Sequence, residues 1–407
     1  MAGYKKRDGN VYQLDIDYYE DENEKNRGDI PDKTRLRFRN LINLHPFRGI
    51  DYSILVLVII LVMFGLVMVF SSSYYYAMTN AKFDYNKFFF FSKQLRAAII
   101  GFGAMIACMV INPHVFRKFA LPAYVVIVAV LGAVLVIGVA TKGSVRWLNV
   151  LGTSLQPSEF AKFVIIIFMS SYMIKYRKYV NGNFKMFILA SLPALAVTLL
   201  VAKENLSTGI VIMAIALAIM FVASKKIINF VVFGIMGFLG FVGLVLMEDY
   251  RRARIVGWLN PFGTGTDEGF QIIQSLYAIA SGGLFGLGLG QSRQKTFVPE
   301  GYNDIIFAII CEELGLVGAV IIIALYALLL WRGIKIAMTA KDKFSAYAAT
   351  GITMMIGIQV VINIAVVTNS IPNTGMPLPF ISYGGTALVV MLASVGLLLN
   401  ISRNCKR

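Results

Sequence analysis

The sequence has 407 residues and is poor in charge, cysteine and histidine. Charged residues make up 15% of it, against about 25% in an average soluble domain. Its two histidines, His45 and His114, make a histidine-based metal site improbable. Its three cysteines lack CxxC spacing and are expected to be free thiols among apolar side chains. These shortages exclude most classes of soluble protein.

The chain has long uncharged runs instead, and hydrophobic residues make up 57% of it. Residues 52–81, 119–141 and 344–402 contain no Asp, Glu, Lys or Arg, and about 20 apolar residues suffice to cross the hydrocarbon layer. The net charge of +16 would also suit a nucleic-acid-binding protein. The long uncharged runs favour a multi-pass membrane protein over a nucleic-acid-binding protein, and no nucleic-acid partner is expected. No cleavable signal peptide is expected, because the first apolar run begins about fifty residues in and is too long.

Charges taken as boundaries predict an all-α polytopic integral membrane protein with ten transmembrane helices. The fourth span requires Glu159 and Lys162 to lie inside the membrane. An eleventh span at 270–292 is an alternative, although that stretch is rich in Gly, Ser and Gln. The ten expected spans are 53–73, 97–113, 119–140, 159–175, 186–203, 206–224, 228–247, 305–331, 345–367 and 384–402.

The distribution of positive charge favours ten spans over eleven. With ten, the inner loops hold 15 Lys and Arg against one acid, and the outer loops hold 12 against nine acids when Glu159, at the edge of the fourth span, is counted with them. Short cytoplasmic loops collect Lys and Arg. Both termini are therefore expected in the cytoplasm, and 270–292 is expected to be an interfacial or re-entrant helix.

Three parts are expected along the chain. Residues 1–50, with ten basic and nine acidic residues, predict a disordered cytoplasmic tail. The basic end of this tail suits anionic lipid headgroups, and a topology signal alone explains it equally well. Residues 51–402 form the membrane domain, and 403–407 a cytoplasmic C-terminus. A large extracellular loop, 248–304, separates helices seven and eight and is too long for a mere connector.

Asp304 opens an apolar helix at the expected outer boundary of the membrane. As a bare feature, an Asp in this place is more often a helix N-cap than a catalyst. Its setting suits a lipid-linked phosphate substrate, because many cations surround one carboxylate. A solvated basic loop that attracts lipid headgroups would show the same charge pattern. The cations of the outer loops are Lys142, Arg146, Arg251, Arg252, Arg254, Arg293 and Lys295.

Further polar features occur within apolar segments. Glu159 and Lys162 lie three residues apart on one helical face and can pair, so a structural ion pair and a contact with substrate stay equally open. For Glu312 and Glu313, within the expected eighth span, a structural role is favoured over a role in which one of them faces a cavity. The glycine-rich stretch 281–290 lacks the preceding strand of a nucleotide-binding loop, so close packing of helices is expected there.

Four strings give the chain a family resemblance from about Asp51 to Ser402: WLNVLGTSLQPSEFAKF (147–163), NPFGTGTDEGFQIIQSLYAIASGGLFGLGLGQSRQK (260–295), VPEGYNDIIFAIICEELG (298–315) and NTGMPLPFISYGG (373–385). The chain resembles the SEDS family (shape, elongation, division and sporulation proteins of the FtsW, RodA and SpoVE type). The resemblance implies a ten-helix peptidoglycan glycosyltransferase of the bacterial plasma membrane. Such an enzyme polymerises lipid II, the undecaprenyl diphosphate-linked disaccharide peptide, on the outer face. The last string looks closer to the FtsW cell-division type.

The resemblance also implies site residues. The family's essential acid carries over to Asp304 in PEGYND, as the catalytic residue. At 203–208 the chain reads KENLST, where the family usually shows a string of the type Q-P-D-L-G-T, so no catalytic role is expected there. Glu159 and Lys162 match the family's PSE-x-x-K segment, and Arg146 matches its basic residue before Trp147. Together with the charged loops, the expected substrate-binding residues are Lys142, Arg146, Glu159, Lys162, Arg254, Lys295 and Glu300.

The chemistry of a diphosphate leaving group supplies a hypothesis for the mechanism. Asp304 accepts the proton of the acceptor's sugar 4-hydroxyl as that oxygen attacks the donor's anomeric carbon, and cations neutralise the departing diphosphate. A divalent cation, Mg or Mn, would also suit the diphosphate, although no carboxylate cluster specifies a site for it.

The resemblance implies partners, and it leaves other functions open. The implied partner is a class B penicillin-binding protein, a transpeptidase, alongside other divisome or elongasome proteins and membrane lipids. A lipid II transporter (flippase) and a membrane scaffold that recruits the transpeptidase are the alternatives. A transporter needs access on both faces of the membrane, whereas the charged candidates gather outside. The sequence leaves the choice between cell division, cell shape and sporulation open.

Overall fold

The structure is a computed structural model. It describes residues 47, 49–137, 139–141, 144–150, 153–203, 205–246, 249–263, 267–297 and 301–405. Residues 42–407 form one unit by their contacts. The expected tail, 1–50, lies almost wholly outside the described residues, so its character stays a prediction.

Helices dominate the described residues, and ten of them have 18 or more residues. Eight of these are long and apolar enough to cross a membrane, while α5 and α9 carry shorter apolar stretches, 120–135 and 228–240. A mostly helical, multi-pass membrane fold is therefore confirmed. The ten helices are α2 (Tyr52–Thr79), α3 (Phe89–Val110), α5 (Ala120–Ile137), α6 (Pro157–Val180), α7 (Phe184–Ala202), α8 (Leu206–Ala223), α9 (Ile228–Leu246), α12 (Ile306–Thr339), α13 (Lys343–Val367) and α14 (Gly385–Ser402).

Shorter helices occupy the connections between the long ones. The stretch at 270–292, expected to be interfacial or re-entrant, contains most of α11, a 16-residue helix. It ends in a loop that packs against α12, as described below. The shorter elements are α4 (Pro113–Lys118), α10 (Asp249–Leu259), α11 (Asp267–Gly282) and the 3-10 turns η3 (Ala81–Phe83) and η4 (Gln294–Thr296).

A small antiparallel sheet stands between α5 and α6. Its strands are β1 (Val139–Thr141), β2 (Ser144–Val150) and β3 (Thr153–Leu155), with Val139 opposite Trp147 and Leu148 opposite Leu155. The expectation of an all-α chain is therefore wrong for this connection. Each pair of strands is separated in the sequence by two residues that end in glycine, a pattern typical of tight hairpins. Placing spans by the positions of charged residues does not detect such a sheet.

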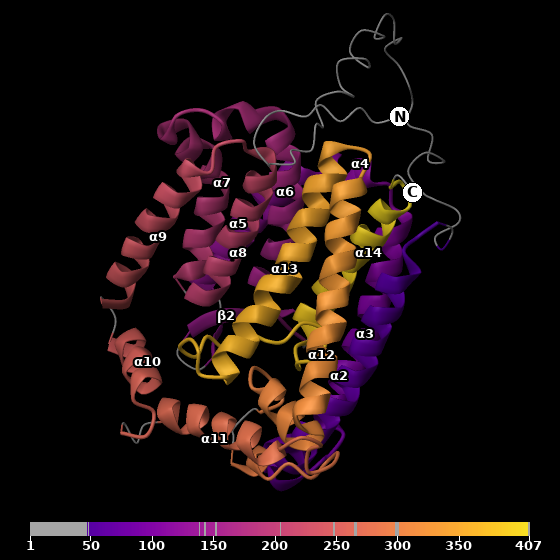
Figure 1. Cartoon of the computed structure of the whole chain (residues 1–407), viewed down its shortest axis with the longest axis vertical. Coiled ribbons are helices and arrows are strands. Elements are labelled where there is room, and N and C mark those ends of the chain that lie inside the picture. Colours follow the sequence, from indigo (N-terminus) through magenta and orange to yellow (C-terminus); the bar gives the residue numbers. More distant parts are fainter. Residues whose placement is uncertain are drawn as a thin grey trace, which may run out of the picture. The chain divides into compact units, whose positions relative to one another are not determined.

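Polar contacts join the start of the first span to the end of the last. The Asp51 carboxylate accepts hydrogen bonds from the backbone N–H groups of Ser53 and Ile54 at the start of α2. It also pairs with Arg332 near the end of α12, at 2.6 Å from Nη2. The Asp51 N–H donates to Ser402 Oγ at 3.0 Å. We call this the Asp51 end of the bundle; the opposite end, where α12 begins, is the Asp304 end (Figure 1).

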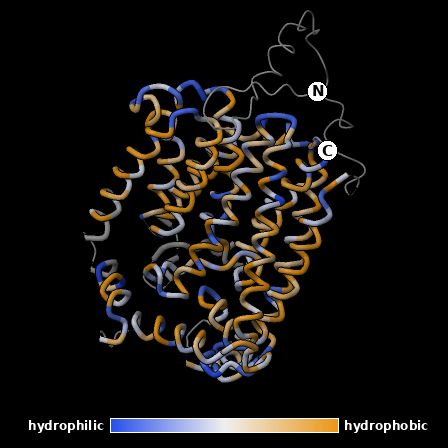
Figure 2. Tube along the Cα trace, viewed as in Figure 1, coloured by the Kyte–Doolittle hydropathy of each residue, from blue (hydrophilic) through white to orange (hydrophobic). Residues whose placement is uncertain are grey.

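The bundle packs most closely around α3, α13 and α14. Helix α14 lies along α3, where a Cβ added at Gly396 would stand 2.2 Å from the Met105 carbonyl oxygen. This close approach is typical of small residues between membrane helices. Helix α13 packs on α6, α8 and α12. Hydrophilic segments collect mainly at the two ends of the helices, whereas the helices themselves are mostly hydrophobic (Figure 2).

Helix α9 contacts the rest of the bundle differently from the other long helices. Near its start, the Phe230 ring packs on Phe187 and Phe221, at centroid distances of 4.8 and 5.5 Å. Farther along, Phe238 and Leu239 are exposed. Exposed apolar side chains suit a helix that faces lipid tails.

Candidate functional site

Asp304 lies in the turn directly before α12. The N-cap of α12 is Ile305, without a side-chain cap, so Asp304 is not the N-cap that its position in the sequence first indicates. Its side chain is half-buried. A Cβ added at Gly375 would stand 3.5 Å from Asp304 Oδ2, so the carboxylate borders this glycine.

An aromatic cluster supports the segment that carries Asp304. The ring of Tyr302, two residues earlier, lies 4.3 Å from Phe90, 5.5 Å from Tyr383 and 6.1 Å from Tyr76, centroid to centroid. The Tyr383 N–H donates to the Tyr302 carbonyl at 3.0 Å. Burial raises the pKa of the Tyr383 phenol, and Arg96 partly opposes the shift. Tyr383 therefore stays a neutral part of the packing at neutral pH.

The loop between α13 and α14, residues 368–384, borders Asp304 and is held by side chains of several helices. From α10, Arg254 Nη1 donates to the Asn373 carbonyl at 3.2 Å, and Trp258 Nε1 donates to the Asn369 carbonyl at 2.9 Å. From α11, Gln271 Oε1 accepts from Asn373 Nδ2 at 2.9 Å. Arg254 thus reaches the same short segment, 373–375, that Asp304 borders. The other anchors are Gln94, which bonds Ser382 and Gly384, and Tyr326, which donates to the Pro379 carbonyl.

Glu159 and Lys162 form the expected ion pair on α6. The Lys162 Nζ stands 2.8 Å from Glu159 Oε2, and the two side chains are 0% and 4% exposed. The ammonium also donates to Gln359 Oε1 on α13 at 3.3 Å. Since the two opposite charges neutralise each other, burial of both is tolerable.

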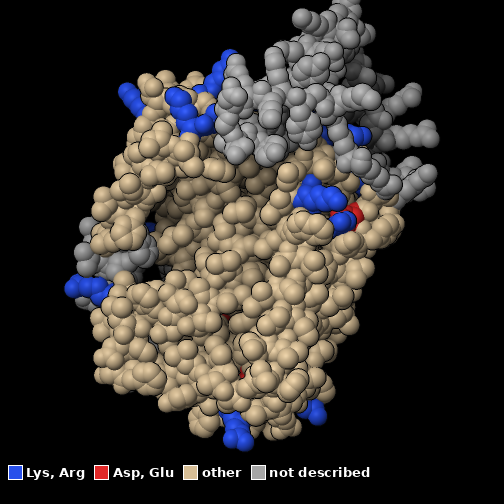
Figure 3. Space-filling view, in the orientation of Figure 1, with Lys and Arg blue, Asp and Glu red and all other residues tan. Residues whose placement is uncertain are grey.

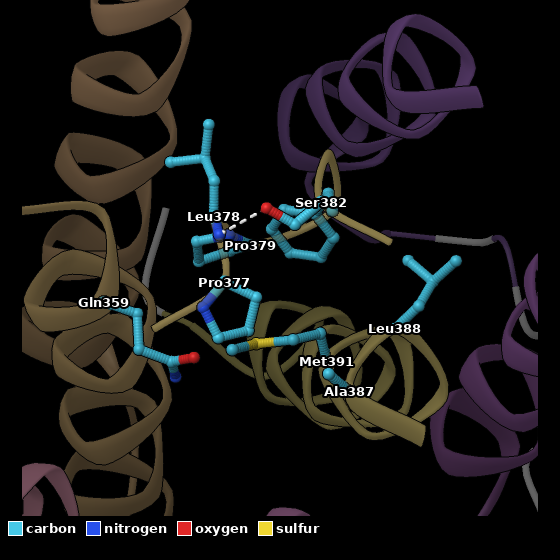
Figure 4. A pocket seen from close by; sticks show the side chains of 9 residues that line it. Gln359, Pro377, Leu378, Pro379, Ser382, Ala387, Leu388 and Met391 are labelled. Atoms are coloured by element: carbon cyan, nitrogen blue, oxygen red, sulfur yellow. Dashed lines mark hydrogen bonds between the residues drawn. The ribbon is translucent and has the colours of Figure 1, made fainter. Parts of the chain in front are cut away.

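Gln359 lines a small cavity beneath the α13–α14 loop (Figure 4). Its other walls come mainly from the loop, including Pro377, Leu378 and Ser382, and from Met391 of α14. The Ser382 hydroxyl accepts from the Leu378 N–H at 2.8 Å, which fixes this part of the wall. The cavity measures about 10 Å³, room for roughly one water molecule.

Glu312 and Glu313 hold the glycine-rich loop against α12. Glu312 accepts from the Ser292 hydroxyl and from the Arg293 N–H, the latter at 2.9 Å. Glu313 accepts from Ser71 of α2 at 2.7 Å. Both side chains are fully buried. These contacts agree with the structural role expected for the two acids.

Lys295 belongs to the same anchor. Its side chain is 3% exposed, its Nζ stands 3.6 Å from Glu313 Oε1, and it donates to the Gly290 carbonyl. The ammonium also lies 4.7 Å from the centre of the Tyr74 ring. These contacts are internal, whereas the sequence predicts that Lys295 binds substrate; that role stays a prediction.

Gly286 and Gly290 offer a matched test of how closely this loop approaches α12. Both have a left-handed backbone, with φ of +79° and +78°, but a Cβ would stand 2.2 Å from the Glu313 carbonyl oxygen at Gly286 and meet nothing within 4 Å at Gly290. Gly290→Ala should cost only the backbone term, about 1–2 kcal/mol. Gly286→Ala should cost about 1–3 kcal/mol more, because it forces the loop off the helix. Thermal unfolding of the two purified variants measures the difference; equal losses would contradict the close packing.

The structure brings some predicted site residues together and leaves others undescribed. Asp304 borders the 373–375 segment, and Arg254 bonds it. Lys162, paired with Glu159, bonds Gln359, which lines the cavity next to the same loop. Lys142 and Glu300 lie outside the described residues, and the side chain of Arg146 is not described. Their roles stay predictions. Within the described residues no group of three or more His, Cys, Asp or Glu side chains could hold a metal ion.

Sequence reasoning missed the uncharged polar residues of the site. Gln94, Gln359 and Asn363 are all buried on long helices. Gln94 and Asn363 bond the α13–α14 loop or the turn that carries Asp304, and Gln359 bonds Lys162. Amides at membrane depth carry a signal of their own, because they need internal partners there. A search restricted to ionisable residues does not register them.

Comparison with known proteins decides the family. The model of the family described as "Cell cycle protein", which covers FtsW, RodA and SpoVE, matches residues 52–407. The chain belongs to this family. Stage V sporulation protein E of Bacillus subtilis is 44% identical over 361 residues, 87% of this chain and 97% of that protein. The probable peptidoglycan glycosyltransferase FtsW of Geobacter sp. (strain M18) is 37% identical over the same shares.

Solved structures show the same fold. A chain from a peptidoglycan synthase complex described as coordinating polymerization and crosslinking is 25% identical, with a TM-score of 0.71 over 88% of this chain and 98% of that one. The rod shape determining protein RodA of Thermus thermophilus is 23% identical, with a TM-score of 0.65 over 89% and 99%. The SEDS resemblance of the sequence is thereby confirmed.

Proposed function

We propose that this SEDS protein is a peptidoglycan glycosyltransferase, a hexosyltransferase that polymerises lipid II into glycan strands on the outer face of the bacterial plasma membrane. Relatives that the chain covers almost completely carry the name peptidoglycan glycosyltransferase. The observation that carries the proposal is the placement of Asp304. Its carboxylate borders Gly375, and Arg254 bonds Asn373 of the same segment.

The proposal includes ten crossings with both ends of the membrane domain in the cytoplasm. It is supported by the contact of Asp51 with Ser402, because an even number of crossings returns the chain to its starting side. The end of α3 lies there too, since Asn400 of α14 bonds the Ile111 carbonyl. Lys and Arg side chains lie mainly toward the ends of the visible face, and a broad area between them shows few charges (Figure 3). The Asp304 end is then the outer one, and 248–304 the outer loop.

The proposed chemistry needs one base and several cations. Asp304 accepts the proton from the acceptor's 4-hydroxyl as this oxygen attacks the donor's anomeric carbon. A cation at the site stabilises the negative charge that develops on the departing diphosphate. Arg254, which reaches the segment that Asp304 borders, is the cation proposed for this role.

Transport of lipid II is the competing function, and the interior of the bundle disfavours it. The buried charges Glu159 and Lys162 are paired with each other, and Lys162 also bonds Gln359. The cavity beside Gln359 is only about as large as a water molecule. A transporter needs polar groups open to a path across the membrane.

A paired assay tests the proposal. Purified protein is mixed with lipid II in detergent and the products are separated on a gel; in parallel, the protein is placed in liposomes and the movement of lipid II between leaflets is measured. We expect a ladder of glycan chains. Movement of lipid II between leaflets without any ladder of glycan chains, in the presence or absence of a transpeptidase partner, would favour the transporter.

We infer a transpeptidase partner, a class B penicillin-binding protein, from the likeness to a chain of a synthase complex. The polymerisation assay with and without this partner measures how far the activity depends on it. A scaffold role is compatible with catalysis and becomes the better account only if the complex makes no polymer. We propose a role in cell division. Depletion in cells tests it, since filaments indicate division and round cells indicate elongation.

A further inference from the structure

We propose that Asn363 is a positioning residue that sets the distance between Asp304 and the α13–α14 loop; this rests on the function proposed above. Asn363 lies on α13 and is fully buried. Its Nδ2 donates to the Asp304 carbonyl at 2.7 Å and to the Met376 carbonyl at 2.7 Å. One carbonyl belongs to the turn before α12 and the other to the loop. A single rigid amide therefore joins the two segments that border the site.

The chemistry of the amide makes this link specific. Its NH₂ group has two donors at a fixed angle, and both are used. The two acceptors are carbonyls, so no other orientation of the amide satisfies them. Within the described residues Asn363 Oδ1 has no hydrogen-bond partner, so the side chain is held through its donors alone. A residue without donors would remove the hydrogen bond from both carbonyls, which destabilises the fold.

Asn363 is also connected to the buried ion pair. Gln359 lies one turn away on the same face of α13. Its Oε1 accepts from Lys162, and its side chain lines the cavity under Pro377 and Leu378 (Figure 4). One face of α13 thus presents two amides, one toward the Asp304 turn and one toward α6. The ion pair and the Asp304 turn are therefore both bonded to amides of the same helix face.

Asn400 provides a matched control at the other end of the bundle. It is fully buried on α14, and its Nδ2 also donates to two carbonyls, those of Cys108 and Ile111. Its Oδ1 likewise has no hydrogen-bond partner within the described residues. Asn400 therefore loses the same kinds of bond as Asn363 when it is replaced, but near Asp51 instead of Asp304.

The experiment compares Asn363→Ala with Asn400→Ala in the full-length protein. Both should lower the melting temperature by similar amounts, since each loses two buried hydrogen bonds. Asn363→Ala should lower kcat for lipid II polymerisation about 10²-fold, because a shift of about 1 Å in a catalytic group has that effect. Its KM should change by no more than about threefold, because the donor-binding groups stay in place. If both variants keep the wild-type kcat, or lose it equally, the positioning role is overturned.

A second variant has a readout that a purely structural role would not move. In Asn363→Asp the buried carboxyl has a raised pKa. When ionised it places negative oxygens against two carbonyls; when protonated it again donates one hydrogen bond. The kcat of folded Asn363→Asp, relative to wild type, should therefore rise as the pH falls through this raised pKa. The matched Asn400→Asp should show a flat ratio. A flat ratio for Asn363→Asp would overturn the proposal even if Asn363→Ala fails to fold.

The outcomes separate this inference from the proposed function. If the wild-type protein makes no polymer, or Asp304→Asn polymerises normally, the proposed function or its catalytic residue fails. If Asp304→Asn is inactive while Asn363→Ala and Asn363→Asp behave like their Asn400 controls, only the positioning role fails.

Discussion

Asp304→Asn is expected to abolish polymerisation of lipid II while the protein still folds and binds its substrate. The amide has nearly the shape of the carboxylate but cannot accept the proton of the attacking hydroxyl. The hydrogen bond from Asn363 goes to the backbone carbonyl of residue 304, so the substitution leaves it in place. General base catalysis contributes about 10²–10⁴-fold, and we expect a loss of at least about 10²-fold in kcat. Gel analysis of glycan chains and a lipid II binding measurement check the two halves of the prediction.

Asp84→Asn is the control for this variant. Asp84 is exposed, and its φ of 54° is a left-handed conformation that Asn also adopts readily. The substitution removes one negative charge from the connection between α2 and α3 without touching the segment around Asp304. It should polymerise at the wild-type rate. Polymerisation at the wild-type rate by Asp304→Asn would contradict the assignment of Asp304 as the general base.

Lys162→Met is expected to destabilise the protein strongly. It leaves the Glu159 carboxylate buried without the ammonium that stands 2.8 Å away. Breaking a buried pair by removing one partner costs about 3–5 kcal/mol. The double variant Glu159→Gln/Lys162→Met removes both charges and should recover most of the loss. Unfolding of both variants in detergent measures this; a single variant as stable as wild type would contradict the importance of the pair.

The double variant also decides between the two roles that the sequence leaves open for this pair. If the stable double variant polymerises lipid II, the pair is structural. If it folds and binds normally but turns over slowly, the pair acts on the site, and Gln359 on α13 is the nearest route to it. If lipid II binding is lost, the pair contacts substrate.

The sequence predicts the helical elements well, with particular exceptions. All ten expected spans correspond to helices of the structure, including the fourth, α6, which carries Glu159 and Lys162. The two charges are tolerated because they neutralise each other. The sheet at 139–155 was missed, since its strands are three to seven residues long and carry little of the apolar signal used to find spans.

For the site, the sequence predicts Asp304 and the polar pair on α6, and it misses the amides that hold them. Asn363 has no unusual neighbours in the sequence, and its role depends on carbonyls 59 and 13 residues away. For Lys295 the sequence predicts substrate binding, a role that stays a prediction. In the structure it is buried against Glu313.

The sequence alone determined that this protein lies in a membrane and which family it resembles. Low charge and long apolar runs require a membrane, because a chain of this composition cannot cover itself with polar groups, and ordered motifs indicate the SEDS family. Only the tertiary structure decided that Asp304 is not a helix cap and that Arg254 reaches the segment that Asp304 borders. It also showed that Asn363 bonds both the turn that carries Asp304 and the α13–α14 loop. Hydropathy reports which medium each residue prefers, whereas these contacts depend on how helices distant in the sequence pack against one another.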